Sequence, residues 1–179
     1  MRTVLIPGIG GSDDDHWQTA WERDSPELHR FSPSSWDEPD LEDWSAALDR
    51  AVADETAILV AHSLGCLLAV RWAQEHPVRV AGVFLVAAPD PAGPRFPPQA
   101  ASFAAGLDAQ VTIPAVLVTS DDDPYSSPEH AATIARRWGI PIVSVGNRGH
   151  LNSASGLGSW SEGRNLLTAF TAGLNAPPR

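Results

Sequence analysis

Lysine is absent from the sequence, cysteine occurs once, and no hydrophobic run is long. The single residue Cys66 excludes a disulfide bond within the chain. No apolar run approaches the ~20 residues that a transmembrane helix requires. Residues 3–6 follow Met1 and Arg2 without the hydrophobic region of a signal peptide. The sequence therefore predicts a cytoplasmic protein.

Basic residues are also scarce. The 12 that occur are all arginine and are outnumbered by 22 acidic residues, which gives a formal net charge of -10 and a pI near 4.8. This charge repels phosphate backbones and anionic lipids. Nucleic acids and membrane surfaces are therefore not expected as partners, and the sequence carries no signal for an oligomeric state.

Short apolar runs rich in β-branched residues alternate with longer stretches of helical spacing. Strands are predicted at 3–6, 57–61, 80–86, 115–119 and 140–145, with a weaker one at 29–32. Helices are predicted at 16–24, 41–53, 64–75, 128–138 and 159–174. The alternation predicts an α/β fold, a three-layer sandwich with a mostly parallel sheet of about six strands. With 43% hydrophobic content and 7 Trp, residues 1–179 are expected to form one domain.

The segment 89–114 breaks this alternation. It contains six prolines, at positions 89, 91, 94, 97, 98 and 114, and a run of small residues at 99–107 that predicts a short helix. A long insert between two strands is typical of a lid or a binding loop. Segment 89–114 is therefore predicted to be a lid or binding insert within the domain.

Residues 57–68, with the sequence AILVAHSLGCLL, pass from a strand directly into a helix. This is the context of the nucleophile elbow G-x-S-x-G, with Ala61 in place of the first glycine and Ser63 as the nucleophile. The amide of Leu64, at the start of the helix, would point at negative charge that develops on a substrate oxygen. The alternative is that Ser63 only caps the helix, because serine is a favoured N-cap residue.

A serine nucleophile needs a base and an acid that orients the base. The strand predicted at 115–119 ends in the sequence SDDDP, and the strand predicted at 140–145 ends before His150. Serine, acid and histidine thus follow one another at strand ends in the order that hydrolases of this type use. His150 is the predicted base, whereas His62 is interpreted as structural or as an anchor for a loop, because it lies inside the elbow turn.

The letters SDDD occur twice, at 12–15 and at 120–123. In the later run Pro124 biases Asp123 away from helical geometry, which favours Asp123 as the acid; Asp122 is the alternative, and the other carboxylates would be solvated or act as caps. The earlier run is predicted to open a helix with Asp15 as its N-cap. A metal site formed by Asp13, Asp15 and His16 is a weaker hypothesis, because no distant ligand pattern completes it.

The glycine-rich segment PGIGG at 7–11 follows the first predicted strand. Its glycines allow the backbone to approach a ligand closely, so Ile9 is predicted to supply the second amide of an oxyanion hole. The spacing does not fit a dinucleotide-binding loop, and no acidic residue closes a second strand at the required distance. Neither a cofactor nor a metal is therefore expected.

Five motifs together resemble the small serine hydrolases of the α/β-hydrolase superfamily that are related to retinoblastoma-binding protein 9 and to YdeN-like proteins. They are PGIGG at 7–11, HW at 16–17, AHSLG at 61–65, DDPY at 122–125 and GH at 149–150. The resemblance implies a reduced α/β-hydrolase fold with a small lid, and a catalytic triad of Ser63, His150 and Asp123. It also implies esterase-like activity on small acyl substrates, which makes a carboxylesterase acting on short-chain esters the leading hypothesis. The alternatives are a thioesterase or acyl transferase, and a protein-binding module with little or no catalysis.

Overall fold

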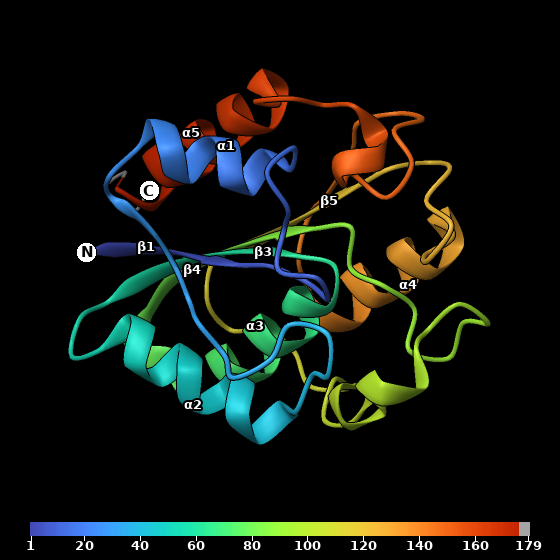
Figure 1. Cartoon of the computed structure of the whole chain (residues 1–179). Coiled ribbons are helices and arrows are strands. Elements are labelled where there is room, and N and C mark those ends of the chain that lie inside the picture. Colours follow the sequence, from blue (N-terminus) through green and yellow to red (C-terminus); the bar gives the residue numbers. More distant parts are fainter. Residues whose placement is uncertain (176–179) are drawn as a thin grey trace.

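Six strands form a single sheet in the centre of the structure, a computed structural model that describes residues 1–175 (Figure 1). The last four residues of the predicted domain 1–179 lie outside this range. The strands, in chain order, are β1 (Arg2–Ile6), β2 (Leu28–Arg30), β3 (Ala57–His62), β4 (Val80–Val86), β5 (Ala115–Thr119) and β6 (Ile142–Ser144). They lie in the order β2-β1-β3-β4-β5-β6, and every neighbouring pair is parallel. The prediction of an α/β fold with a parallel sheet is confirmed.

Five α-helices cover the two faces of this sheet. They are α1 (Trp17–Asp24), α2 (Leu41–Val52), α3 (Leu64–Glu75), α4 (Pro128–Trp138) and α5 (Ser161–Leu174). Helices α1 and α5 lie on one face, and α2, α3 and α4 lie on the other, which gives the three layers of the sandwich (Figure 1). Within residues 1–175, no helix is long and apolar enough to cross a membrane.

Several elements differ from the predicted bounds by one to three residues, and three of these differences have local reasons. The last strand starts at Ile142 rather than at 140, because Pro141 has no amide hydrogen to donate to the sheet. Helix α5 starts at Ser161 rather than at 159, because Trp160 takes a left-handed conformation with φ 41°. The helix predicted at 99–107 is a 3-10 helix at Pro98–Ala104, which buries Ala100 and Phe103.

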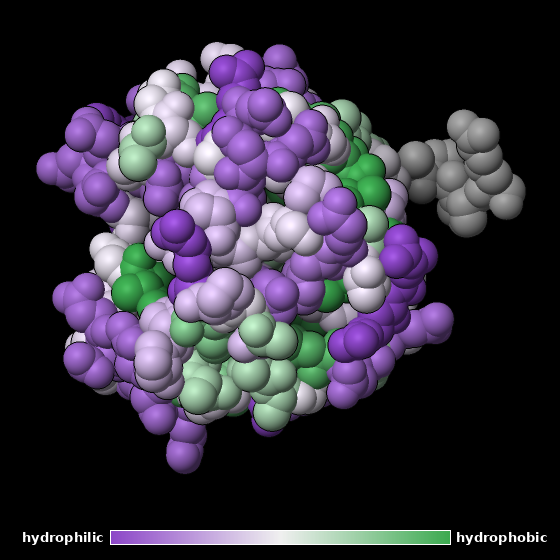
Figure 2. All heavy atoms as spheres, turned by 90° about the vertical axis from the view of Figure 1, so that its right-hand side faces the viewer, coloured by the Kyte–Doolittle hydropathy of each residue, from purple (hydrophilic) through white to green (hydrophobic). Residues whose placement is uncertain are grey.

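The carboxyl ends of the six parallel strands meet at one edge of the sheet, on the right in Figure 1. Segment 89–114, which joins β4 to β5, lies on the lower side of that edge (Figure 1). Figure 2 looks onto this face and shows a mixture of hydrophilic and hydrophobic side chains, with hydrophobic ones gathered in its lower half. In parallel sheets the loops at this edge are where ligands bind.

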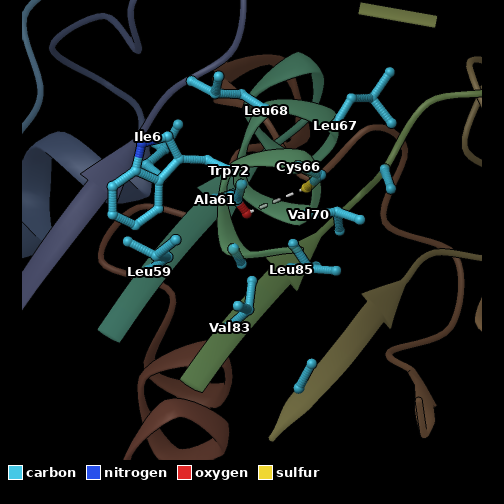
Figure 3. Close-up of a cluster of buried hydrophobic side chains, with 14 of the residues drawn as sticks. Ile6, Leu59, Ala61, Cys66, Leu67, Leu68, Val70, Trp72, Val83 and Leu85 are labelled. Atoms are coloured by element: carbon cyan, nitrogen blue, oxygen red, sulfur yellow. Dashed lines mark hydrogen bonds between the residues drawn. The ribbon is translucent and has the colours of Figure 1, made fainter. Parts of the chain in front are cut away.

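Each face of the sheet carries its own hydrophobic core, and tryptophans are prominent in both. Trp44, Trp72 and Trp138 belong to the core under α2, α3 and α4, whereas Trp17, Trp21 and Trp160 belong to the core under α1 and α5. Figure 3 shows part of the first core, where side chains of β3 and β4 lie against α3. Strand β3 is buried at every position, as expected for a central parallel strand. The first core holds α3 on the sheet and so fixes the residue at its start.

Candidate active site

Ser63 occupies the turn between β3 and α3, with φ 53° and ψ -127°. A positive φ is rare outside glycine and costs of the order of 1–3 kcal/mol, so such strain is typical of functional positions. The Ser63 side chain makes no capping hydrogen bond to α3. Its Oγ instead lies 2.8 Å from Nε2 of His150. The alternative in which Ser63 only caps the helix is therefore wrong.

Two glycines make this turn possible by close packing. A Cβ at Gly65 would lie 2.3 Å from the carbonyl oxygen of Ile6, and a Cβ at Gly8 would lie 2.8 Å from the Cβ of Ser63. Both contacts are too short for any side chain. The first turn of α3 and the loop after β1 therefore press directly against Ser63.

His150 and Asp123 continue the chain of contacts that begins at Ser63. Nδ1 of His150 lies 2.9 and 3.0 Å from the two carboxylate oxygens of Asp123. The Asp123 side chain is 2% exposed and that of His150 is 8% exposed. With Nδ1 donating to the carboxylate, Nε2 is left as the acceptor for the Ser63 hydroxyl, which is the tautomer that a general base requires.

The three carboxylates of the later SDDD run have three different partners. Asp121 accepts a hydrogen bond from the Ser144 hydroxyl at 2.6 Å, which links the loop after β5 to β6. Asp122 accepts one from the amide of Gly149 at 2.7 Å, and this bond is the main cause that lowers its pKa. Asp122 is exposed to solvent, as predicted, and it also holds the amide of the residue before His150. The pairing was not visible in the sequence because it joins the ends of two different strands.

Aromatic side chains also support His150. Nε2 of His62 lies 2.9 Å from the carbonyl oxygen of His150, so the elbow holds the backbone of the histidine directly. The centroids of the Tyr125 and His150 rings lie 4.4 Å apart. The indole of Trp17 donates a hydrogen bond to the carbonyl of Leu151 at 2.8 Å. These contacts fix the His150 loop from three separate elements.

The earlier SDDD run does not open helix α1 in the predicted way. His16, not Asp15, is the N-cap, and its Nδ1 accepts a hydrogen bond from the amide of Gln18 at 3.1 Å. Asp13 accepts from the Asp15 amide and from the Ser153 hydroxyl, so it joins the loop after β1 to the segment after His150. No group of His, Cys, Asp or Glu within residues 1–175 has the arrangement of a metal site.

Leu64 and Ile9 line the cavity over Ser63, and the backbone amide of each has no acceptor among the described residues. The Leu64 amide is the first of α3, and the missing Cβ of Gly8 would lie 3.3 Å from its nitrogen. The glycine-rich loop therefore reaches the amide at the elbow, as the arrangement of an oxyanion hole requires. Sequence reasoning selected the same two amides.

A cavity of about 500 Å³ opens over Ser63 and His150. Apolar side chains line much of it, including Ile9, Leu64, Phe96 and Tyr125. The charged side chains in the lining are those of Asp13 and Arg95, apart from histidines. Segment 89–114 contributes one wall through residues 89, 95–97 and 99. It thus forms part of the pocket, where a lid or binding insert is expected to lie.

Two buried histidines in this region predict a pH dependence of stability. Burial lowers the pKa of His16 from 6.5 to about 4, and burial lowers the pKa of His62 well below 6.5. At a pH between the lowered pKa of each histidine and 6.5, the unfolded chain binds protons that the folded protein does not. The free energy of unfolding is therefore expected to be level above about pH 7 and to fall by about 1.4 kcal/mol per pH unit per histidine below pH 6.5.

The contribution of His16 is measured by urea unfolding at pH 7.5 and pH 5. His16→Asn keeps a side chain that can cap α1 but removes the titrating ring. Its loss of stability between these pH values is expected to be smaller than that of the unchanged protein by about 2 kcal/mol. Equal losses in the two proteins would contradict the assignment.

The order of the parallel sheet and the strained serine at the carboxyl end of β3 define an α/β-hydrolase fold. The sequence of residues 3–169 matches the family model described as serine hydrolase, and the chain belongs to this family. Comparison with curated protein sequences gives no match.

Solved structures similar to this chain include hydrolases of the same kind. A YdeN-like hydrolase of Pectobacterium atrosepticum is 34% identical, with a TM-score of 0.86 over 97% of this chain and 91% of that one. The ydeN gene product of B. subtilis is 21% identical, with a TM-score of 0.79 over 96% of this chain and 100% of that one. A thermophilic esterase of Thermogutta terrifontis is 15% identical, with a TM-score of 0.70 over 98% of this chain and 91% of that one, and shares the fold. The predicted relationship to YdeN-like hydrolases is confirmed.

Proposed function

We propose that the protein hydrolyses carboxylic esters of small acyl groups through a covalent acyl-enzyme. The observation that carries this proposal is the chain of hydrogen bonds from Asp123 through His150 to Ser63, whose Oγ lines the cavity. In a neutral imidazole held this way, one nitrogen is fixed as the donor and the other is free to take a proton.

The proposed reaction follows from these contacts. Nε2 of His150 takes the proton of Ser63 as Oγ attacks the ester carbonyl, and Asp123 stabilises the imidazolium. The amides of Leu64 and Ile9 donate to the oxyanion, and the imidazolium gives its proton to the leaving alcohol. Water then attacks the acyl-enzyme with His150 again as base, which releases the acid and restores Ser63. No step uses a metal or a cofactor.

The size of the cavity supports a small substrate. Ligand pockets commonly span ~300–1,000 Å³, and the cavity here, at about 500 Å³, lies in the lower part of that range. Short acyl chains would fit between the apolar side chains of Ile9 and Phe96. A thioester or a non-aqueous acyl acceptor would use the same acyl-enzyme, and nothing in the cavity favours either. We retain the expectations of a cytoplasmic protein with a small-molecule partner.

A fluorophosphonate probe tests the mechanism directly. The folded protein is expected to be labelled at Ser63, as determined by mass spectrometry of the digested adduct, because phosphorus probes react with an activated serine. Hydrolysis of 4-nitrophenyl acetate and butyrate, followed by absorbance, tests turnover. A folded protein that neither reacts with the probe nor hydrolyses these esters would contradict the proposal and would favour the binding-module alternative.

A further inference from the structure

Arg95 is the one arginine in the lining of the catalytic cavity, and its side chain makes no ion pair or hydrogen bond within residues 1–175. In the same part of the chain, six arginines pair with carboxylates: Arg2, Arg30, Arg71, Arg79, Arg137 and Arg164. The net charge of -10 provides many carboxylates, yet none pairs with Arg95. The guanidinium therefore remains available to whatever enters the cavity.

The local backbone holds Arg95 at this place. The amide of Phe96 donates to the carbonyl of Gly93 at 3.1 Å, which closes a turn with Pro94 and Arg95 at its two central positions. Proline at the first central position restricts the turn. Phe96 packs partly buried against the core beneath α3. One side of the turn is thus anchored in the core while the neighbouring residue, Arg95, lines the cavity.

The acidic residue of this segment that lies nearest in sequence is already engaged elsewhere. Asp90 accepts a hydrogen bond from the amide of Ala92 at 2.9 Å, and its other carboxylate oxygen lies 3.3 Å from Nδ1 of His130. The amide of Asp90 donates to the carbonyl of Tyr125 at 2.8 Å, which ties the start of the segment to the loop after β5. These contacts keep the Asp90 carboxylate on His130 rather than on Arg95.

Apart from Arg95 and the histidines, one charged side chain belongs to the lining of the cavity. Asp13 is the only Asp or Glu among the lining residues, and its carboxylate accepts hydrogen bonds from the Ser153 hydroxyl and from the Asp15 amide. A negatively charged group on a bound molecule would be repelled near Asp13 and attracted near Arg95. A wholly apolar ester would gain nothing from either charge.

We propose that the substrate is an ester that carries a carboxylate, and that Arg95 binds this carboxylate while Ser63 attacks the ester carbonyl. The proposal rests on the function proposed above and names the substrate class of that site. A guanidinium binds a carboxylate through two parallel hydrogen bonds. Because the protein as a whole is strongly acidic, its field disfavours a doubly charged phosphate more than a singly charged carboxylate. Arg95 is thus a specificity residue of the hydrolase.

The test compares matched esters. Mono-4-nitrophenyl glutarate and 4-nitrophenyl pentanoate differ by a carboxylate on the acyl side, whereas 4-acetoxybenzoate and its methyl ester differ by a carboxylate on the alcohol side. The readout is the ratio of kcat/KM for the charged ester to that for its neutral partner. One of the two pairs is expected to give a ratio above unity that falls as salt is raised, because an exposed ion pair is screened. The responding pair identifies the side of the ester that lies against segment 89–114.

Variants of Arg95 test whether this side chain causes the preference for the charged ester. Arg95→Gln is expected to lower the ratio about tenfold, mainly through KM, and Arg95→Glu about a hundredfold, whereas Arg95→Lys restores part of it. Arg23→Gln is the control, since Arg23 is exposed on α1, is outside the cavity lining and loses the same charge. Its ratio is expected to equal that of the unchanged protein.

The possible failures are distinguishable. If the probe labels Ser63 and the neutral esters are hydrolysed, but neither pair shows a preference that depends on Arg95, this inference is wrong and the hydrolase function stands. If the folded protein reacts with neither the probe nor any of the four esters, the hydrolase function is wrong and this inference fails with it.

Discussion

Ser63→Ala is expected to lower kcat for a short-chain 4-nitrophenyl ester by about 10⁵- to 10⁶-fold. The substitution removes the only oxygen that lies within hydrogen-bond distance of Nε2 of His150 among residues 1–175. The amides of Leu64 and Ile9 would remain, so a small rate above that in water is expected from them alone. The measurement is steady-state hydrolysis together with probe labelling, which should disappear.

The fold of this variant should be unchanged. Alanine has the same Cβ as serine, so it carries the same strain at φ 53°, and the lost hydroxyl makes no hydrogen bond to α3. The midpoint of thermal unfolding is therefore expected to move by no more than about 5 °C. Ser45→Ala, which removes a hydroxyl that bonds to the carbonyl of Leu41 on α2, is the control and should keep full activity. Retention of more than about 1% of activity in Ser63→Ala would place the nucleophile elsewhere.

The elbow was predictable from sequence because every residue that forms it is local. The strand and the helix around Ser63 are continuous in sequence, without a loop between them, and the fit of Gly65 against β1 follows from the tightness of that turn. The parallel sheet also followed from local patterns, because alternating strands and helices form strand-helix-strand units whose strands are parallel. Structure that forms among residues close together in the sequence could therefore be predicted from the sequence.

Contacts between segments could not be predicted in the same way. The N-cap of α1 is an example: Asp15 has the stronger intrinsic preference, yet His16 caps the helix because the core around His62 buries its ring. The role of Asp122 is another, because its partner Gly149 lies 27 positions away and comes close only when β5 pairs with β6. The sequence analysis did not single out Arg95, because the absence of a paired carboxylate depends on the folded structure and not on any local pattern.

The second large effect is expected from substitution of Asp123, the predicted acid, in comparison with its neighbour Asp122. Asp123→Asn is expected to lower kcat about 10⁴-fold. The side chain keeps its size, but its amide group can donate to Nδ1 of His150, which places the ring proton on Nε2. That nitrogen can then no longer accept the proton of Ser63. The loss should appear in kcat with little change in KM, because the hydrogen bond acts on the base rather than on the substrate.

Asp122→Asn is the matched control, with the same chemical change one residue earlier. Its side chain keeps an oxygen that can accept from the Gly149 amide, so the loop before His150 should hold its shape and kcat should fall by less than about tenfold. Measuring both variants on the same ester separates the residue that orients the imidazole from the residue that holds its loop. If Asp122→Asn lost the larger factor, the acid would be Asp122, and the contact of 2.9 Å between Asp123 and His150 would have no catalytic role.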